Sequence, residues 1–302
     1  MIRRVELDQS FLPPALHLGT SSFSSDDWLG GFYPVSARPA DYLSHYAMHF
    51  RTVEIDATWH VVPSIKTFEA WERKVPEGFV FSLKVPKTIT HEKYLMGCEQ
   101  EWCDFLKLCD ALGPKRGPLL FQFPYVSQTQ EPGEWETGED FRRRLEAFLP
   151  QLPEGCRYAI EVRNEKWVDE RLLDLLRSKN VALALVAYHT MPSGPELLRR
   201  LDPITADFGY IRFLGHHREM DLLVAEAREE GRRRGDWDSV LLDREADTRP
   251  WISAIHELLG RTRETFVYFN NHYAGFAPGS VELFLRLWKE EAGLSEPNPE
   301  RA

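Results

Sequence analysis

The sequence predicts an α/β protein that folds as a single (β/α)8 TIM barrel, and three observations favour this fold class. Eight short strand-like segments follow one another along the 302-residue chain, with a helical or connecting segment between each pair. Eight such units in about 250–300 residues are typical of a closed barrel. After the first strand-like segment the chain reads Gly-Thr-Ser-Ser-Phe, which lacks the glycine fingerprint of an open dinucleotide-binding sheet.

The individual elements follow from hydrophobic periodicity. Strands are predicted at residues 17–21, 52–56, 80–84, 119–123, 158–162, 182–186, 210–214 and 266–270. Helices are predicted at 38–50, 64–74, 99–112, 140–149, 169–178, 249–259 and 278–288, with a short one at 192–201. We expect an N-terminal extension over 1–15, the barrel over 16–292 and a disordered tail over 293–302.

Two long insertions interrupt this pattern. Residues 127–138 follow the fourth strand, and the charged segment 216–247, which contains three consecutive arginines at 232–234, follows the seventh. Both emerge where strands end, which is the face on which TIM barrels carry their active sites. Loops this long in a compact domain are typically lids, partner surfaces or disordered segments.

Composition narrows the function classes. The formal net charge of −10 disfavours indiscriminate nucleic-acid binding. No apolar run approaches the roughly 20 residues that cross a bilayer, and the N-terminus lacks a signal-peptide segment, so a cytoplasmic protein without membrane contact is expected. The cysteines, Cys98, Cys103, Cys109 and Cys156, lack the close pairs of zinc sites and are expected to be reduced thiols. No cofactor or bound metal is predicted.

The stretch Tyr158–Arg163 shows how the barrel interior is expected to be built. Bulky residues at 158, 160 and 162 alternate with Ala159, Glu161 and Arg163. Successive side chains of a strand point to opposite faces, and in a barrel the bulky ones pack under the helices. Glu161 and Arg163 should therefore face the inside of the barrel, near the end where its strands finish.

The same alternation places polar residues on the inner face of most other strands. The inward set comprises Glu54, Asp56, Lys84, Gln122, Glu161, Arg163, Arg212 and Asn270. Buried charges are costly unless they are paired, so this set implies either mutual pairing or a polar ligand. A salt-bridged plug that only fills the barrel mouth is one interpretation, and a binding or catalytic site for a small polar or anionic compound is the other.

Within the second interpretation, the residue types suggest roles. Glu54 and Glu161 are candidates for the acid and base, because two carboxylates in unlike environments can take opposite roles. His91 follows the third strand closely and is a third catalytic candidate. The predicted ligand-binding residues are Lys84, Gln122, Arg163, Arg212, Asn270 and Asn271.

Several motifs in order resemble the YecE-like family, also known as domain of unknown function 72. They are Gly19-Thr-Ser, Trp28-Leu-Gly-Gly-Phe-Tyr-Pro34, Val53-Glu-Ile-Asp56, Phe81-Ser-Leu-Lys84 with Thr90-His91, Gly117-Pro-Leu-Leu-Phe-Gln-Phe-Pro124, Ala159-Ile-Glu-Val-Arg163 with Trp167, Ile211-Arg-Phe-Leu-Gly215 and Val267-Tyr-Phe-Asn-Asn271. The resemblance implies a TIM barrel and no specific reaction. The sequence departs from the family pattern at Asp56, where the family usually has asparagine, and at Leu214, where it usually has histidine.

Three functions remain open at this point. The leading hypothesis is a metal-independent enzyme, a hydrolase or lyase, that acts on a small anionic or sugar-like compound at the barrel mouth. The second is a metal-dependent phosphoesterase or nuclease-like barrel, in which Glu54, Asp56, Glu161 and His91 would be ligands. The third is a non-enzymatic binding or scaffold protein that uses the two insertions as its contact surface.

Overall fold

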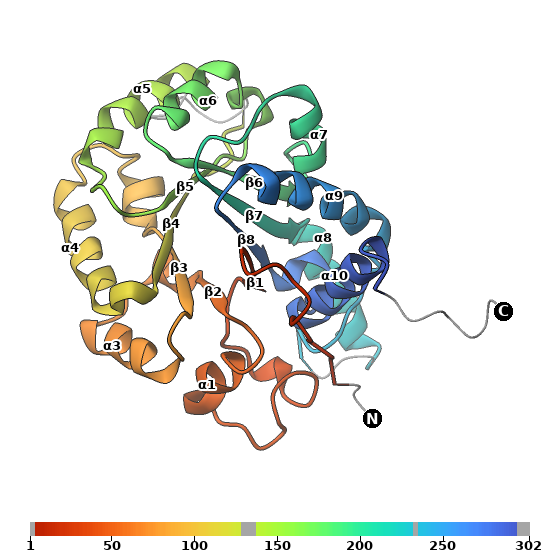
Figure 1. Cartoon of the computed structure of the whole chain (residues 1–302). Helices are drawn as coiled ribbons and strands as arrows, with labels where there is room; N and C mark the ends of the chain where they lie inside the picture. The colour runs from red at the N-terminus through yellow and green to blue at the C-terminus, as the bar shows by residue number, and fades with distance from the viewer. Residues whose placement is uncertain (1–3, 128–136, 232–234, 295–302) are drawn as a thin grey trace.

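A computed structural model describes residues 4–127, 137–231 and 235–294 as an eight-stranded parallel barrel surrounded by helices (Figure 1). The strands are β1 (Leu16–Thr20), β2 (Thr52–Ile55), β3 (Val80–Lys84), β4 (Arg116–Gln122), β5 (Tyr158–Glu161), β6 (Ala182–Tyr188), β7 (Phe208–Gly215) and β8 (Glu264–Phe269). Each predicted strand overlaps one of these, which confirms the TIM-barrel prediction.

The sheet runs in the order β1-β8-β7-β6-β5-β4-β3-β2. Its two edge strands, β1 and β2, are bridged by the side chain of Tyr46. The Tyr46 hydroxyl accepts a hydrogen bond from the Thr20 amide (2.9 Å) and donates one to the Thr52 carbonyl (3.1 Å). A side chain at Gly19 would collide with that same carbonyl oxygen, since a Cβ there would lie 2.4 Å from it. The barrel is therefore nearly closed.

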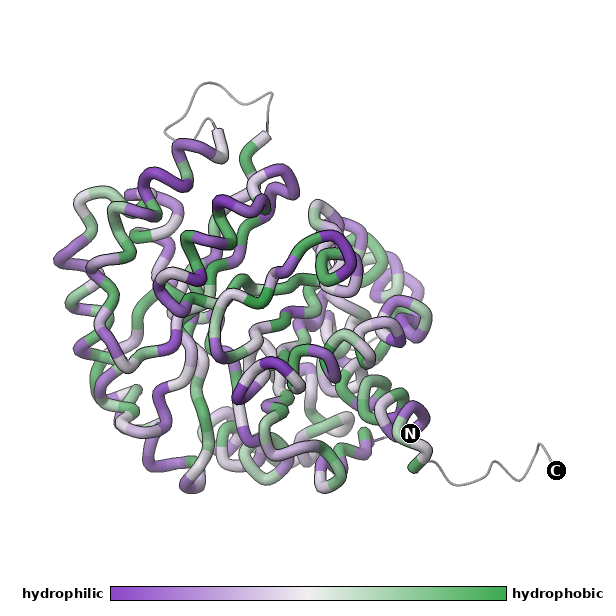
Figure 2. The backbone as a smooth tube through the Cα atoms, turned by 45° about the horizontal axis from the view of Figure 1, so that its top comes forward, coloured by the Kyte–Doolittle hydropathy of each residue, from purple (hydrophilic) through white to green (hydrophobic). Residues whose placement is uncertain are grey.

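The predicted alternation of side chains is confirmed by two separate hydrophobic clusters. Ile160, Ile211 and Phe213 belong to the large cluster between the strands and the helices. Ala159 and Tyr210, their chain neighbours, belong to a smaller cluster inside the barrel. Along the helices of the outer ring, hydrophilic and hydrophobic segments alternate (Figure 2), as expected where one helical face packs on strands and the other meets water.

The helices are α1 (Tyr42–Tyr46), α2 (Ala57–His60), α3 (Ile65–Lys74), α4 (Glu99–Cys109), α5 (Gly138–Phe148), α6 (Glu170–Arg177), α7 (Gly194–Arg200), α8 (His217–Glu229), α9 (Glu245–Arg261) and α10 (Ala277–Glu291). Side chains cap several N-termini: Asp169 accepts from the Leu172 amide at the start of α6, and Ser193 accepts from the Glu196 amide at the start of α7. None of the helices in the described ranges combines the length and apolarity that crossing a bilayer requires.

The structure differs from the sequence prediction mainly after β7. The segment expected to be a long charged insertion contains α8, whose buried face includes Met220 and Val224. Helix α9 begins at Glu245, four residues before the predicted start, and continues through Pro250. Burial of Trp251 and Ile252 in the same turn offsets the backbone hydrogen bond and the steric clash that a proline costs inside a helix. Most of the insertion after β4 (128–136), the arginines at 232–234 and the tail from 295 lie outside the described residues. The four cysteines are unpaired, as predicted.

Candidate active site

The C-terminal mouth of the barrel contains a compact network of charged side chains from β2, β5 and β7. Glu54 and Glu161 are fully buried, and only 1% of Arg212 is exposed. These three residues were predicted to face inward together, and the structure brings them into direct contact.

Arg212 is the centre of the network. Its Nε and Nη2 donate to Glu54 Oε1 (3.1 and 2.6 Å), and Nη1 donates to Glu161 Oε2 (2.6 Å). Nη2 also donates to Asp56 Oδ1 (3.1 Å). All three guanidinium nitrogens are thus bound by carboxylates. These four hydrogen bonds use four of the five N–H donors of the guanidinium. A direct role of Arg212 in ligand binding remains a prediction.

Glu161 is held between two arginines. Arg163 Nε donates to its Oε1, while Arg212 holds Oε2. Burial acts to raise the pKa of Glu161, but Arg163 and Arg212 outweigh it and lower the pKa to about 2. With both oxygens occupied and so low a pKa, Glu161 is a poor proton acceptor and a strong anchor for the two arginines.

Glu54 has a different environment. Tyr210 donates to its Oε2 (2.6 Å), and burial raises the pKa of Glu54 despite the neighbouring Arg212. The two glutamates therefore differ in pKa, as the acid–base hypothesis requires. Both are nevertheless enclosed by their partners, and their catalytic roles remain predictions.

Lys84, at the end of β3, is the least satisfied charge in the network. Its Nζ lies 3.9 Å from Asp56 Oδ1 and 4.8 Å from the centre of the Trp59 ring, and it donates no hydrogen bond to any described residue. Its side chain is only 11% exposed. Burial lowers the pKa of Lys84, and Asp56 opposes that shift.

Arg163 presents its free end at the same mouth. Its Nε is bound to Glu161, whereas its Nη1 and Nη2 have no hydrogen-bond partner among the described residues. The guanidinium carbon lies 3.9 Å from the centre of the Tyr188 ring, a cation–π contact that orients the planar group without using its donors. Lys84 and Arg163 are thus two cations with unused donors.

His91 lies beside Lys84. The Trp59 Nε1–H, which can only donate, points at His91 Nδ1 (3.4 Å), and the Thr90 hydroxyl is 2.8 Å from the same atom. Nδ1 is therefore the acceptor, and the proton of the neutral ring lies on Nε2. Burial, together with Lys84 and Arg163, lowers the pKa of His91 to about 4.

The predicted amide residues have varied surroundings. Gln122 is buried at the end of β4 and donates to the carbonyl of Phe123. Asn270 accepts from the backbone amide of His272 (3.0 Å) and contacts its Nδ1 (2.9 Å). Asn271 accepts from the Ala277 amide (2.9 Å), at the start of α10. Asn271 therefore has a structural partner, and the ligand-binding roles of all three amides remain predictions.

The mouth also contains residues that the sequence prediction missed. Ser21 continues the inward side of β1, and its buried hydroxyl has no hydrogen-bond partner in the described part of the chain. The strand alternation could have identified it. His217, at the start of α8, stacks on His272 (4.2 Å between ring centres) and leaves its buried Nε2 unpartnered among the described residues. No periodic signal marks a residue contributed by a loop or a helix end.

The arrangement offers little to a metal ion. In the ranges 4–127, 137–231 and 235–294, no group of three or more His, Cys, Asp or Glu side chains is positioned to hold one. Glu54, Asp56 and Glu161 all direct oxygens at Arg212 instead.

The buried histidines predict how stability depends on pH. The pKa of His91 is lowered to about 4 and that of His217 to about 3, in both cases mainly by burial, whereas an unfolded histidine titrates near 6.5. Below pH ~6.5 the unfolded chain therefore binds more protons, so the free energy of unfolding should fall as the pH drops from 6.5 to 5. Denaturant unfolding between pH 6.5 and 5 should show that the free energy of unfolding falls less in the double variant His91→Gln/His217→Gln than in the wild type. Equal slopes in wild type and double variant would contradict the prediction.

Comparison with known proteins identifies the family. A family model described as "Protein of unknown function DUF72" matches residues 17–302. The chain belongs to the DUF72 family. This confirms the resemblance drawn from the motifs.

Relatives of this DUF72 chain extend the comparison. UPF0759 protein YecE of Escherichia coli K12 is 29% identical over 126 residues, an alignment that covers 41% of this chain and only 42% of YecE. UPF0759 protein YunF of Bacillus subtilis 168 is 24% identical over 298 residues, covering 93% of this chain and 97% of YunF.

Solved structures agree with the fold. The crystal structure of a DUF72 family protein from Thermotoga maritima superposes with a TM-score of 0.70 at 25% identity, covering 91% of this chain and 99% of that one. The structure of SacUVDE gives a TM-score of 0.54 at 11% identity, covering 92% of this chain and 99% of that one. At that identity the likeness concerns the fold alone.

Proposed function

We propose that this DUF72 protein is an enzyme, a hydrolase or lyase, that binds a small anionic compound at the C-terminal mouth of the barrel. Lys84 and Arg163 would hold the anionic group, and His91 would polarise an oxygen of the bound compound. The observation that carries the proposal is the set of unused donors on two nearly buried cations.

The cost of burying a charge supports this assignment. A charged group taken out of water destabilises a protein unless it is paired and hydrogen-bonded. Arg212 meets this condition through three carboxylates, whereas the Lys84 ammonium has no hydrogen bond among the described residues and its nearest carboxylate oxygen is 3.9 Å away. A plug selected for stability would not leave this group unsatisfied. A planar fork and a point charge together suit a phosphate or a carboxylate.

The tautomer of His91 supports a role as hydrogen-bond donor. Because Nδ1 accepts from Trp59, the neutral ring offers Nε2–H, which has no partner among the described residues. A neutral imidazole can polarise a carbonyl or phosphoryl oxygen without adding a full charge. A bound anion would also offset the field of Lys84 and Arg163, which contributes to the lowered pKa of His91.

The other functions have less support. Arg212 holds one oxygen of each glutamate, and Tyr210 and Arg163 hold the other two. This disfavours glycoside chemistry by two independent carboxyl groups. The net charge of −10 disfavours a long polyanion such as a nucleic acid. A scaffold role of the insertions would leave the arrangement of Lys84 and Arg163 without a purpose.

Phosphate binding tests the proposal. We expect phosphate or citrate to raise the melting temperature of the wild type, and Lys84→Met or Arg163→Met to weaken phosphate binding by about 10–100-fold, the usual effect of losing a charged hydrogen bond. Isothermal titration calorimetry at fixed ionic strength would measure the change. Lys107→Met is the matched control, because it removes the same charge from an exposed site on α4.

The same variants separate a ligand site from a plug. If Lys84 serves a ligand, Lys84→Met should melt at the same temperature as the wild type or higher, since it removes an unsatisfied buried charge. A clear loss of stability together with unchanged phosphate affinity would contradict the proposed function.

A further inference from the structure

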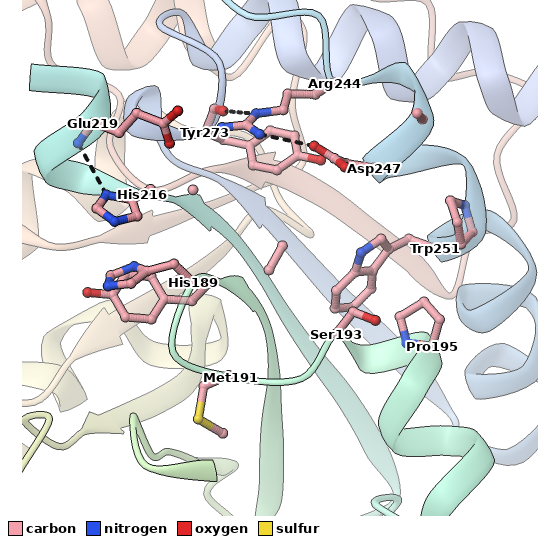
Figure 3. Close-up of a pocket in the computed structure, with 15 residues that line it drawn as sticks. His189, Met191, Ser193, Pro195, His216, Glu219, Arg244, Asp247, Trp251 and Tyr273 are labelled. Atoms are coloured by element: carbon pink, nitrogen blue, oxygen red, sulfur yellow. Dashed lines mark hydrogen bonds and ion pairs between the residues drawn. The ribbon is translucent and has the colours of Figure 1, made fainter. Parts of the chain in front are cut away.

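A cavity lies directly beside the mouth, between the ends of β6 and β7 and the start of α9 (Figure 3). Its volume is 490 Å³, within the roughly 300–1,000 Å³ of small-molecule sites. Tyr188 belongs to both places: it lines the cavity, and its ring contacts the Arg163 guanidinium. The Thr190 hydroxyl donates to the Arg163 carbonyl (2.8 Å), which ties the cavity wall to the end of β5.

The walls are largely rings. The rings of His189 and His216 lie against each other, tilted by 31° with 4.0 Å between their centres. Figure 3 shows them on one side of the cavity with Trp251 and Pro195 on the other. Flat rings on facing walls suit a planar ligand, since base–aromatic stacking tolerates any planar heterocycle.

Among the charged side chains that line the cavity, carboxylates outnumber cations. The carboxylates of Glu219 and Asp247 line it, and Arg244 donates to Asp247 (3.0 Å) and to the Tyr273 carbonyl (2.8 Å). Its one lining arginine is therefore already engaged. Asp247 is engaged with it, whereas the Glu219 carboxylate pairs with no cation among the described residues. Glu219 can therefore repel an anionic group and accept hydrogen bonds from N–H donors.

We propose that this cavity binds an amino-substituted heteroaromatic ring of the same ligand whose anionic group is held by Lys84 and Arg163. The ligand class is therefore that of a nucleoside monophosphate: an anion for the mouth, joined to a neutral ring with N–H donors for the cavity. This inference rests on the proposed function, because the mouth supplies the anion site.

The test compares three probes by calorimetry: inorganic phosphate, phenyl phosphate and adenosine 5′-monophosphate. In the wild type we expect phenyl phosphate to bind more tightly than phosphate, and the adenosine monophosphate to bind tightest, about tenfold or more above phosphate. Ala246→Trp, at an exposed position of α9 that lines the cavity, should fill it. That variant should remove the advantage of the two ring-bearing probes and leave phosphate affinity within about twofold.

Met191→Trp, on another wall of the cavity, repeats the test if Ala246→Trp folds poorly. Equal affinities of the three probes, or a ring advantage that both filled variants retain, would overturn the inference and leave the proposed function intact. Absence of phosphate binding in the wild type would overturn the proposed function and this inference with it.

Discussion

Arg212→Met should destabilise the protein by about 3–5 kcal/mol, the usual cost of removing one partner from a buried ion network. The change leaves Glu54 and Glu161 fully buried and close together, with their shared counter-ion gone. Methionine fills part of the space but donates no hydrogen bond. Denaturant unfolding at pH 7 measures the loss, and Arg200→Met, at an exposed ion pair on α7, is the control with an expected cost of about 0–1 kcal/mol.

The pH dependence of this variant provides an independent readout. Without Arg212 the pKa of Glu54, which burial already raises, should rise further, and the lowered pKa of Glu161 should rise as well. The variant would then bind protons at a higher pH than its unfolded chain, so its deficit relative to wild type should shrink as the pH falls from 7 toward 5. A deficit that stays constant across this range would mean that the carboxylates are not the source of the loss.

Glu161→Ala should cost a similar amount, about 3–5 kcal/mol, for the opposite reason. It removes the carboxylate that binds Arg163 and Arg212, and two guanidinium groups then face each other without it. Glu161→Gln keeps the shape and one acceptor oxygen but loses the charge, so its loss should be smaller than that of Glu161→Ala and still measurable.

Comparing the two Glu161 variants by thermal and denaturant unfolding also tests whether water reaches the charged network around Arg212. Full burial of Glu161 predicts large losses. If both variants lost less than about 1 kcal/mol, the value typical of solvated pairs, the centre of the mouth would be open to water. Phosphate binding should weaken in both variants, because Glu161 orients Arg163.

Much of the barrel was predictable because its signals are local. The alternation at Tyr158–Glu161 correctly separated Ile160, under the helices, from Ala159 and Glu161, inside the barrel. Strand geometry enforces that alternation whatever the rest of the chain does. The same rule brought Glu54, Glu161 and Arg212 together before any contact was known.

Predictions from hydrophobic periodicity failed for residues in loops and at helix ends, where the sequence has no repeating pattern. His217, Trp59 and the cavity beside Tyr188 depend on how helix ends and loops after different strands fold over the mouth. Helix α8 lies in a segment whose charge content suggested an insertion, and its few apolar residues become informative only once they pack on neighbours.

The fold class, the family and the set of charged residues that face the barrel interior could all be predicted, because each follows from period-two strands and ordered motifs. How those charges pair depends on the tertiary structure. Arg212, Arg163 and Lys84 are alike in sequence terms, yet Arg212 is bound by three carboxylates while Lys84 and Arg163 keep unused donors. That difference depends on distances of a few ångströms between strands far apart in the chain, which no pattern along one strand can specify.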